Sequence, residues 1–178
     1  MYRNISYMEI ITQLPQFFTA SIFKKKHLLQ REKYKQIILD SLQFLVRDNR
    51  VFLYSFCFMS NHIHLIWQIR PGHRYQDVQR DFLKFTSQKI RFDLLEHHPE
   101  ELSQFEVNLK DRKFQFWQRN PLSVELFTHS VFMQKLEYIH WNPVKAGLCQ
   151  IPELYFWSSA RFYEEGNNDF SFLTHYKG

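Results

Sequence analysis

The chain has 178 residues, 44% of them hydrophobic, which is enough to build one domain around a substantial core. This composition excludes a disordered or collagen-like chain. No apolar run approaches the ~20 residues of a membrane span, and residues 1–11 mix charged and polar side chains among their apolar ones, unlike a secretory signal. We therefore expect a single domain over residues 1–178 that has no membrane partner.

The charge of the chain favours a polyanionic partner. Lysine and arginine number 23 against 18 aspartate and glutamate residues, a formal net charge of +5, which favours nucleic acid ahead of an acidic membrane. Aromatic residues make up 18% of the chain, which suits both a core and stacking on unpaired bases. The two cysteines, Cys57 and Cys149, lie far apart and form neither a paired metal motif nor a disulfide framework. A reducing cytoplasm is therefore the expected compartment.

The N-terminal part of the chain alternates strand and helix patterns. Residues 16–23 (QFFTASIF) alternate in polarity, are rich in aromatics and predict a first strand. Residues 32–47 repeat apolar side chains at helical spacing and predict a helix. Two further strands are expected at residues 51–58 and 62–69. The tight connection 59–61 joins them as a hairpin.

The C-terminal part begins with a long helix expected over residues 75–97. Residues 99–112 are charged and irregular, and residues 114–118 (FQFWQ) predict another strand. A last helix is expected over residues 130–142, because its apolar residues recur at helical spacing and Pro143 stands where the helix should stop.

The resulting order, β-α-β-β-α-β-α, predicts an α+β fold. We expect an antiparallel sheet with helices packed on one face, in a ferredoxin-like or RRM-like β-α-β-β-α-β core, followed by a C-terminal helix. The aromatic tail at residues 155–163 is expected to pack back on this body.

Two histidines stand on one face of the predicted strand 62–69. Alternate side chains of a strand share a face, so its apolar residues at odd positions point into the core. His62 and His64 then lie side by side on the other face, where they could converge on one divalent ion. Helices on only one side of the sheet would leave that face open to a substrate. The plainer alternative is two histidines on a solvated strand face, and zinc is a further possibility because imidazole suits zinc.

A tyrosine and an asparagine share one face of the predicted helix 130–142. Tyr138 and Asn142 lie one turn apart, about a quarter-turn from the apolar stripe of the helix. Tyr138 could therefore border the sheet with its hydroxyl free, and Asn142 could present its amide oxygen to the same place. By spacing alone, a tyrosine at the rim of an amphipathic helix is the favoured explanation of the pattern.

Three separated motifs resemble those of the HUH single-tyrosine transposases, in particular the REP-associated tyrosine transposases and their insertion-sequence relatives. Those proteins carry M-P-N-H-x-H on a strand, a helix ending Y-I-x-x-N-P-V-x-A-G-L, and a W-S-S motif. The corresponding segments here are residues 59–64 (MSNHIH), 138–148 and 157–159. Ser60 replaces the common proline, and residues 116–119 match a usual feature just before the tyrosine helix.

The resemblance implies a single-stranded DNA endonuclease and strand transferase. Tyr138 would attack a DNA phosphate to give a covalent 5′-phosphotyrosine and a free 3′-hydroxyl, with no need for ATP. His62, His64 and Asn142 would hold Mg²⁺ or Mn²⁺. Folded-back, hairpin-forming single strands would be the substrate, and the protein would act in the cytoplasm at the bacterial nucleoid. Whether the site forms within one chain or across a homodimer stays open.

Basic side chains suggest where DNA could bind. On the predicted helix 75–97, basic and polar residues recur at i, i+4, i+8 and i+11, which predicts a rail for the DNA backbone or simply a solvated helix face. The segment 112–113 (RK) is a further basic candidate. The DNA-binding candidates are Arg80, Lys84 and Arg91 of this stripe, together with Lys24, Lys25, Lys26, Arg119 and Lys135.

Two other functions compete with this interpretation. One is a zinc-dependent hydrolase that uses His62 and His64 with a further ligand such as His129 or His140. The other is a non-catalytic nucleic-acid-binding domain, because α+β sheets with aromatic faces often bind RNA or DNA.

Overall fold

A four-stranded antiparallel sheet is the centre of the computed structural model, which describes residues 14–166 and 169–177. Its strands are β1 (Gln16–Ser21), β2 (Val51–Phe58), β3 (His62–Ile69) and β6 (Leu122–Glu125), in the spatial order β2-β3-β1-β6. This is the order of a β-α-β-β-α-β core, so the predicted fold class is confirmed. The expectation that the N-terminus is not a secretory signal concerns residues 1–11, which lie outside the described residues.

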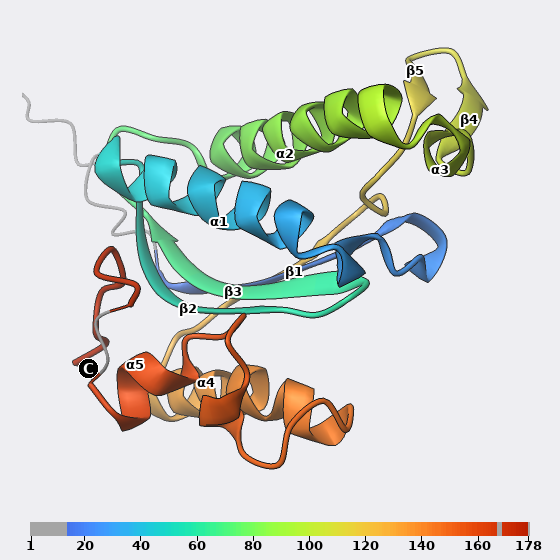
Figure 1. Cartoon of the computed structure of the whole chain (residues 1–178). Helices are drawn as coiled ribbons and strands as arrows, with labels where there is room; N and C mark the ends of the chain where they lie inside the picture. The colour runs from blue at the N-terminus through green and yellow to red at the C-terminus, as the bar shows by residue number, and fades with distance from the viewer. Residues whose placement is uncertain (1–13, 167–168, 178) are drawn as a thin grey trace, which may run out of the picture.

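Two long helices cover one face of the sheet (Figure 1). These are α1 (Glu32–Arg47) and α2 (Tyr75–His97), and both have the predicted bounds. Their apolar stripes pack on the sheet around the fully buried Phe18 and Trp67, and the burial of each such side chain contributes about 1.5–3 kcal/mol. Within the described part of the chain, no helix has the length and apolarity to span a membrane.

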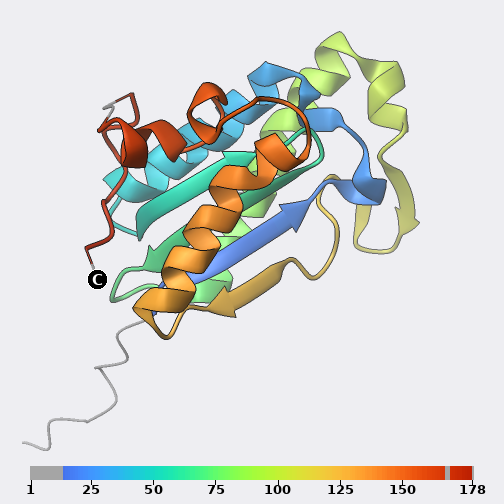
Figure 2. The same cartoon turned by 90° about the horizontal axis from the view of Figure 1, so that it is seen from below.

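The tyrosine helix packs on the opposite face. Helix α4 (His129–Lys145) and the short α5 (Ala160–Glu164) lie below the sheet in Figure 1, and Figure 2 shows α4 lying over the sheet between β2 and β1. Buried Phe132, Leu136 and Ile139 of α4 contact a second apolar cluster of the sheet. We expected this face to be open. Instead α4 covers part of it, because its apolar stripe must be buried and the first face is already occupied by α1 and α2.

The last strand of the sheet is not the one that the sequence predicts. Residues 114–118 do not form it: only Phe114 lies in a strand, β5 (Arg112–Phe114), which pairs with β4 (Glu106–Leu109) in a separate hairpin. The backbone of residues 116–118 forms hydrogen bonds with Ser21, the last residue of β1, and with Phe23 just beyond it. Trp117 is buried there. The aromatic residues of this segment therefore indicate that it is buried, and they do not indicate a strand of the sheet. The true edge strand β6 (LSVE) is exposed and lacks that signal.

Smaller segments complete the chain. The first strand ends at Ser21, and the segment that follows contains two 3-10 turns, Phe23–Lys25 and Leu28–Gln30. The charged segment expected to be irregular forms α3 (Pro99–Ser103) and the β4-β5 hairpin. A third 3-10 turn, Pro152–Leu154, follows α4.

Helix α4 runs one turn further than predicted, to Lys145, with Pro143 inside it. A proline in the last turn removes only one backbone donor. The end is defined instead by Gly147, whose φ of +71° is left-handed. Leu148 N donates to Pro143 O and Gly147 N to Val144 O, both at 2.9 Å, which is the Schellman pattern of helix termination.

Replacing Gly147 by alanine is expected to destabilise the protein by about 1 kcal/mol, because an L side chain resists the left-handed backbone. A Cβ there meets nothing within 4 Å, so steric clash adds nothing. The free energy of unfolding from urea titration measures the effect. Gly147→Asn is the control, because asparagine tolerates this conformation, and an alanine variant as stable as wild type would contradict the prediction.

The aromatic tail packs back on the sheet, as predicted. Phe58 N donates to Trp157 O at 2.9 Å and Ser159 N to Phe56 O at 3.0 Å, so the W-S-S segment covers the outer edge of β2. The hydroxyl of Ser159, which is fully buried, also bonds His140 Nε2 at 2.9 Å. This motif therefore joins α4 to the sheet.

Acidification is expected to destabilise the fold through His140. Burial lowers the pKa of His140 from 6.5 to about 4. Between these values the unfolded chain binds more protons than the folded one, so this contribution to stability is complete above pH 6.5 and is lost as the pH falls towards 4. We expect a loss of about 2 kcal/mol at pH 5, seen in urea midpoints against pH. His140→Gln should make the profile shallower, with the remaining slope coming from groups such as His64, and identical profiles for both proteins would refute the assignment.

Candidate functional site

The two histidines of β3 are held in place through their Nδ1 atoms. His62 Nδ1 donates to Asn61 Oδ1 at 2.6 Å, and a 2.7 Å hydrogen bond joins His64 Nδ1 to the hydroxyl of Thr19 on β1. The ring centroids are 4.8 Å apart. A partner on Nδ1 orients the ring and leaves Nε2 to bind a ligand, as in metal-binding histidines.

His64 Nε2 is buried and has no hydrogen-bond partner among the described residues. A buried polar atom without a partner costs about 1–3 kcal/mol, so it calls for an explanation. Burial, together with the charge of His62, Lys25 and Lys135, lowers the pKa of His64 to about 3. The nearby Asn142 amide raises the pKa of His64, although its geometry with Nε2 is not that of a normal hydrogen bond. His64 is therefore neutral at physiological pH, with a lone pair available for a metal ion.

His62 has the same character in a more accessible position. Its side chain is half-buried, and burial together with the charge of Lys25 lowers its pKa. Both imidazoles thus favour the neutral form that binds metal ions.

Tyr138 lies beside the histidines of the same chain. Its ring centroid is 5.5 Å from that of His64 and 5.9 Å from that of Phe17, both in edge-on contacts. The side chain is 40% exposed, so it is not enclosed by packed apolar residues. Asn142, one turn later, donates from Nδ2 to Tyr138 O at 2.8 Å. The structure therefore unites the predicted tyrosine and histidines in one molecule.

The cations predicted to bind DNA divide between two places. Near the histidines, Lys25 donates to Ser21 Oγ at 2.7 Å, and Ser21 pairs with His62 in the sheet. Lys135 Nζ is 5.6 Å from the centroid of the Tyr138 ring. Lys24 is exposed, and Lys26 turns away to bond Gln104 Oε1 at 2.9 Å. Within the described part of the chain, neither lysine forms a hydrogen bond, ion pair or ring contact with the histidines or with Tyr138.

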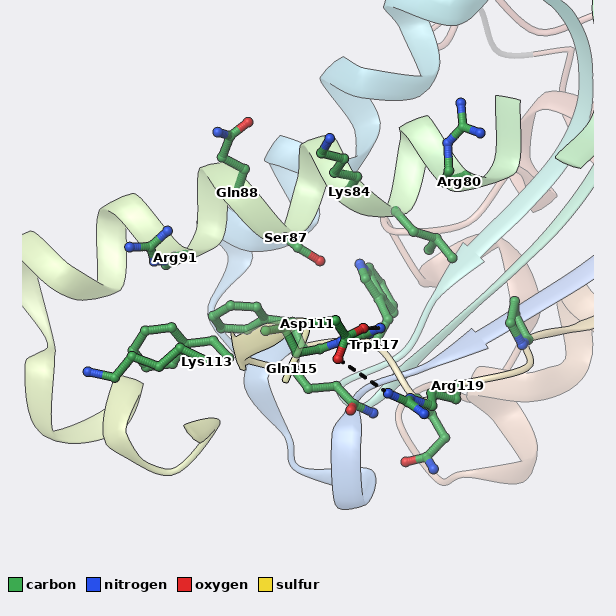
Figure 3. A pocket seen from close by; sticks show the side chains of 16 residues that line it. Arg80, Lys84, Ser87, Gln88, Arg91, Asp111, Lys113, Gln115, Trp117 and Arg119 are labelled. Atoms are coloured by element: carbon green, nitrogen blue, oxygen red, sulfur yellow. Dashed lines mark hydrogen bonds and ion pairs between the residues drawn. The ribbon is translucent and has the colours of Figure 1, made fainter. Parts of the chain in front are cut away.

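The remaining predicted cations line a groove of about 670 Å³ between α2 and residues 111–121. Ser87 points into it from α2, opposite the Trp117 indole, while Lys84 and Gln88 rise along its rim (Figure 3). The cations that line this groove are Arg80, Lys84, Arg91, Arg112, Lys113 and Arg119.

Part of the charge in this groove is already balanced. Arg80 pairs with Asp77 at 2.8 Å and with Asp81 at 3.0 Å. Asp111 pairs with Arg112 and lies 3.8 Å from Arg119. Lys84 and Arg91 form no ion pair with any residue that the structure describes, so they carry the uncompensated charge on the α2 side.

The third ligand required by a zinc hydrolase does not come from the histidines expected to provide it. His140 is buried against Ser159 and Ser55, and His129 stacks on Tyr176. Across residues 14–166 and 169–177, no group of three or more His, Cys, Asp and Glu side chains could hold a metal ion. The donor set near Tyr138 is therefore two imidazoles and the Asn142 amide.

Sequence reasoning missed two residues of this site. Thr19, which orients His64, follows from the register of β1 against β3, and that pairing has no local sequence signal. Lys145 also contacts the Tyr138 ring, but it was placed beyond the end of the helix.

Comparison with known proteins identifies the class. Residues 17–121 match the family described as "Transposase IS200 like", and because this is more than half of the sequence, the chain belongs to that transposase family. Membership implies nuclease and strand-transfer activity. No curated protein sequence matches the chain.

Two solved structures are similar in fold. A REP-associated tyrosine transposase bound to a REP hairpin has a TM-score of 0.65 and 19% identity, over 88% of this chain and 82% of that one. A putative transposase from Deinococcus radiodurans R1 has a TM-score of 0.49 and 14% identity, over 78% of this chain and 95% of the other.

Proposed function

We propose that this protein cuts and transfers single-stranded DNA through a covalent bond to Tyr138. The observation that carries this proposal is the contact between the half-exposed Tyr138 ring and His64, whose buried Nε2 has no hydrogen-bond partner in the described part of the chain. A phenol oxygen here can reach a phosphate bound at the histidines. Family membership supports the same class of reaction.

The reaction is a displacement at phosphorus. The Tyr138 oxygen forms a bond to phosphorus and loses its proton, while the bond from phosphorus to the DNA 3′-oxygen breaks and that oxygen gains a proton. The products are a 5′-phosphotyrosine and a free 3′-hydroxyl. The phosphodiester energy is kept, so the 3′-hydroxyl of a second strand can reverse the step without ATP.

The residues near Tyr138 fit a divalent cation, Mg²⁺ or Mn²⁺. His62 and His64 supply neutral imidazoles, and Asn142 supplies an amide oxygen on the adjoining turn. When bound, such an ion withdraws charge from the phosphate during the displacement. Mg²⁺ prefers oxygen, so water and the DNA phosphate would provide its remaining ligands. Thr19 and Asn61 keep the rings oriented for this task.

Hairpin DNA is the proposed substrate, and the solved relative bound to a hairpin supports it. The basic groove at α2 is the proposed anchor for the DNA backbone. Ser21 connects the groove to the histidines. Its carbonyl accepts a hydrogen bond from Gln118 N in the groove wall, and on its other side Ser21 pairs with His62 in the sheet. A strand leaving the groove would pass Lys25 before it reaches Tyr138. Because Tyr138 contacts His64 of its own chain, a homodimer is not needed to complete the site.

The test uses hairpin oligonucleotides copied from repeats that flank the coding region, incubated with the protein and Mn²⁺ and analysed on denaturing gels. A 3′-end label should move to the protein, and a 5′-end label should appear on a released fragment with a free 3′-hydroxyl. A 5′-label on the protein would reverse the proposed polarity. If no hairpin gives an adduct while binding persists, the protein is a DNA-binding domain without this activity.

A further inference from the structure

A second lysine, Lys145, lies on the same face of α4 as Tyr138. Lys135 precedes Tyr138 by about one turn and Lys145 follows it by about two. The Nζ atoms of both lysines are 5.6 Å from the centroid of the Tyr138 ring. Lys145 occupies this face only because α4 continues through Pro143 to the cap at Gly147.

These ammonium groups have no anionic partner among residues 14–166 and 169–177. Lys33 and Lys113, elsewhere in the molecule, each pair with a carboxylate. By contrast, Lys25, Lys135 and Lys145 form no ion pair with any described residue. Glu137, although next to Tyr138 in sequence, lines a different hollow with His140 and Trp141. Three lysines near the tyrosine site therefore carry positive charge that no described carboxylate neutralises.

Contact with the aromatic ring alone does not explain this arrangement. A cation over an exposed ring contributes about 0.5–1 kcal/mol, and one lysine is enough for that. Two ammonium groups that no described carboxylate neutralises stand at one half-exposed ring, and this concentration of positive charge favours an anion beside the ring. A phosphodiester is an anion whose oxygens can accept hydrogen bonds from both lysines.

We propose that Lys145, together with Lys135, binds the phosphate backbone of the DNA strand at the point of cleavage, which makes Lys145 a catalytic residue. This rests on the proposed function. Lys145 offsets the negative charge that grows on the phosphate oxygens as Tyr138 attacks, and it holds the strand against the ring. Lys145 is exposed, so its replacement should not affect folding.

The first test measures binding without chemistry. The affinity of a fluorescein-labelled hairpin with a single-stranded arm is followed by anisotropy in EDTA over a range of salt concentrations. For single strands each lost phosphate contact reduces the slope of log K against log salt by about 0.7, so Lys145→Met should reduce it by that amount and Lys145→Arg should not. The matched control is Lys89→Met, because Lys89 also lies on a helix over an aromatic ring, 5.5 Å from Phe85.

The second test measures single-turnover adduct formation with Mn²⁺ at saturating DNA. Lys145→Met is expected to be slower by about 30-fold and Lys145→Arg by less than about threefold. An unchanged salt slope in Lys145→Met overturns the proposal, whatever the rate, because it means that Lys145 binds no phosphate. If the wild-type protein forms no adduct, the proposed function fails, and the salt slopes still decide whether Lys145 contacts DNA.

Discussion

Tyr138→Phe is expected to abolish covalent attachment of the protein to DNA, with a loss of at least about 10³-fold in the rate of adduct formation. The substitution removes only the hydroxyl oxygen. The ring keeps its edge-on contacts with His64 and Phe17, so the fold and the affinity for hairpin DNA should stay as in the wild type. Adducts are measured on denaturing gels, and binding is measured by anisotropy on the same preparation.

The matched control for this substitution is Tyr75→Phe. Tyr75 begins α2 on the other side of the sheet, where its hydroxyl bonds Ser123 Oγ at 2.6 Å. It should form adducts at the wild-type rate. Adduct formation by Tyr138→Phe at that rate would mean that another residue is the nucleophile. Strand cleavage by the wild type without any covalent adduct would instead indicate hydrolysis.

His64→Gln is expected to reduce metal-dependent cleavage by about 100-fold or more, because it replaces a proposed ligand that also touches the nucleophile. The ring of His64 stacks on Phe17, and the residue is only 3% exposed. The shorter reach and different shape of the amide would therefore also displace any bound ion. Cleavage rates are measured over a Mn²⁺ titration. Mn²⁺ binding is measured separately by calorimetry on DNA-free protein.

His97→Gln serves as the control for this second substitution, since His97 lies exposed at the end of α2 near Asp93. It should bind Mn²⁺ and cleave DNA like the wild type. If His64→Gln binds Mn²⁺ and cleaves as well as His97→Gln, the ion is not held at His64. Chelation by EDTA should stop cleavage by the wild type while hairpin binding continues.

Local pattern was sufficient for most of the regular elements. The bounds of β2, β3, α1 and α2 agree with those expected from the sequence, because apolar side chains repeat there with the period of a strand or a helix. The same period put His62 and His64 on the face away from the main core. The order of the motifs along the chain also indicated the transposase family, and the match over residues 17–121 confirms it.

Where local signals conflicted, the sequence was misleading. Phe116 and Trp117 looked like a strand because aromatic residues favour strands, yet they are buried beyond the end of β1. Pro143 looked like the end of a helix, yet the left-handed Gly147 sets that end two residues past Lys145. Both errors arise because burial and capping depend on neighbours outside the segment.

The sequence by itself determined the first three strands of the sheet, helices α1 and α2, the tyrosine helix, and the class of chemistry that the motifs suggest. Only the tertiary structure decided that α4 packs on the histidine face, which brings Tyr138 to His64. It also decided that β1 pairs with β3, which brings Thr19 to Nδ1 of His64, and that α4 continues to Lys145, which places this lysine beside the tyrosine. The physical reason is that a helix buries its apolar stripe against whichever surface is left uncovered. That surface exists only after the sheet and its first two helices have come together.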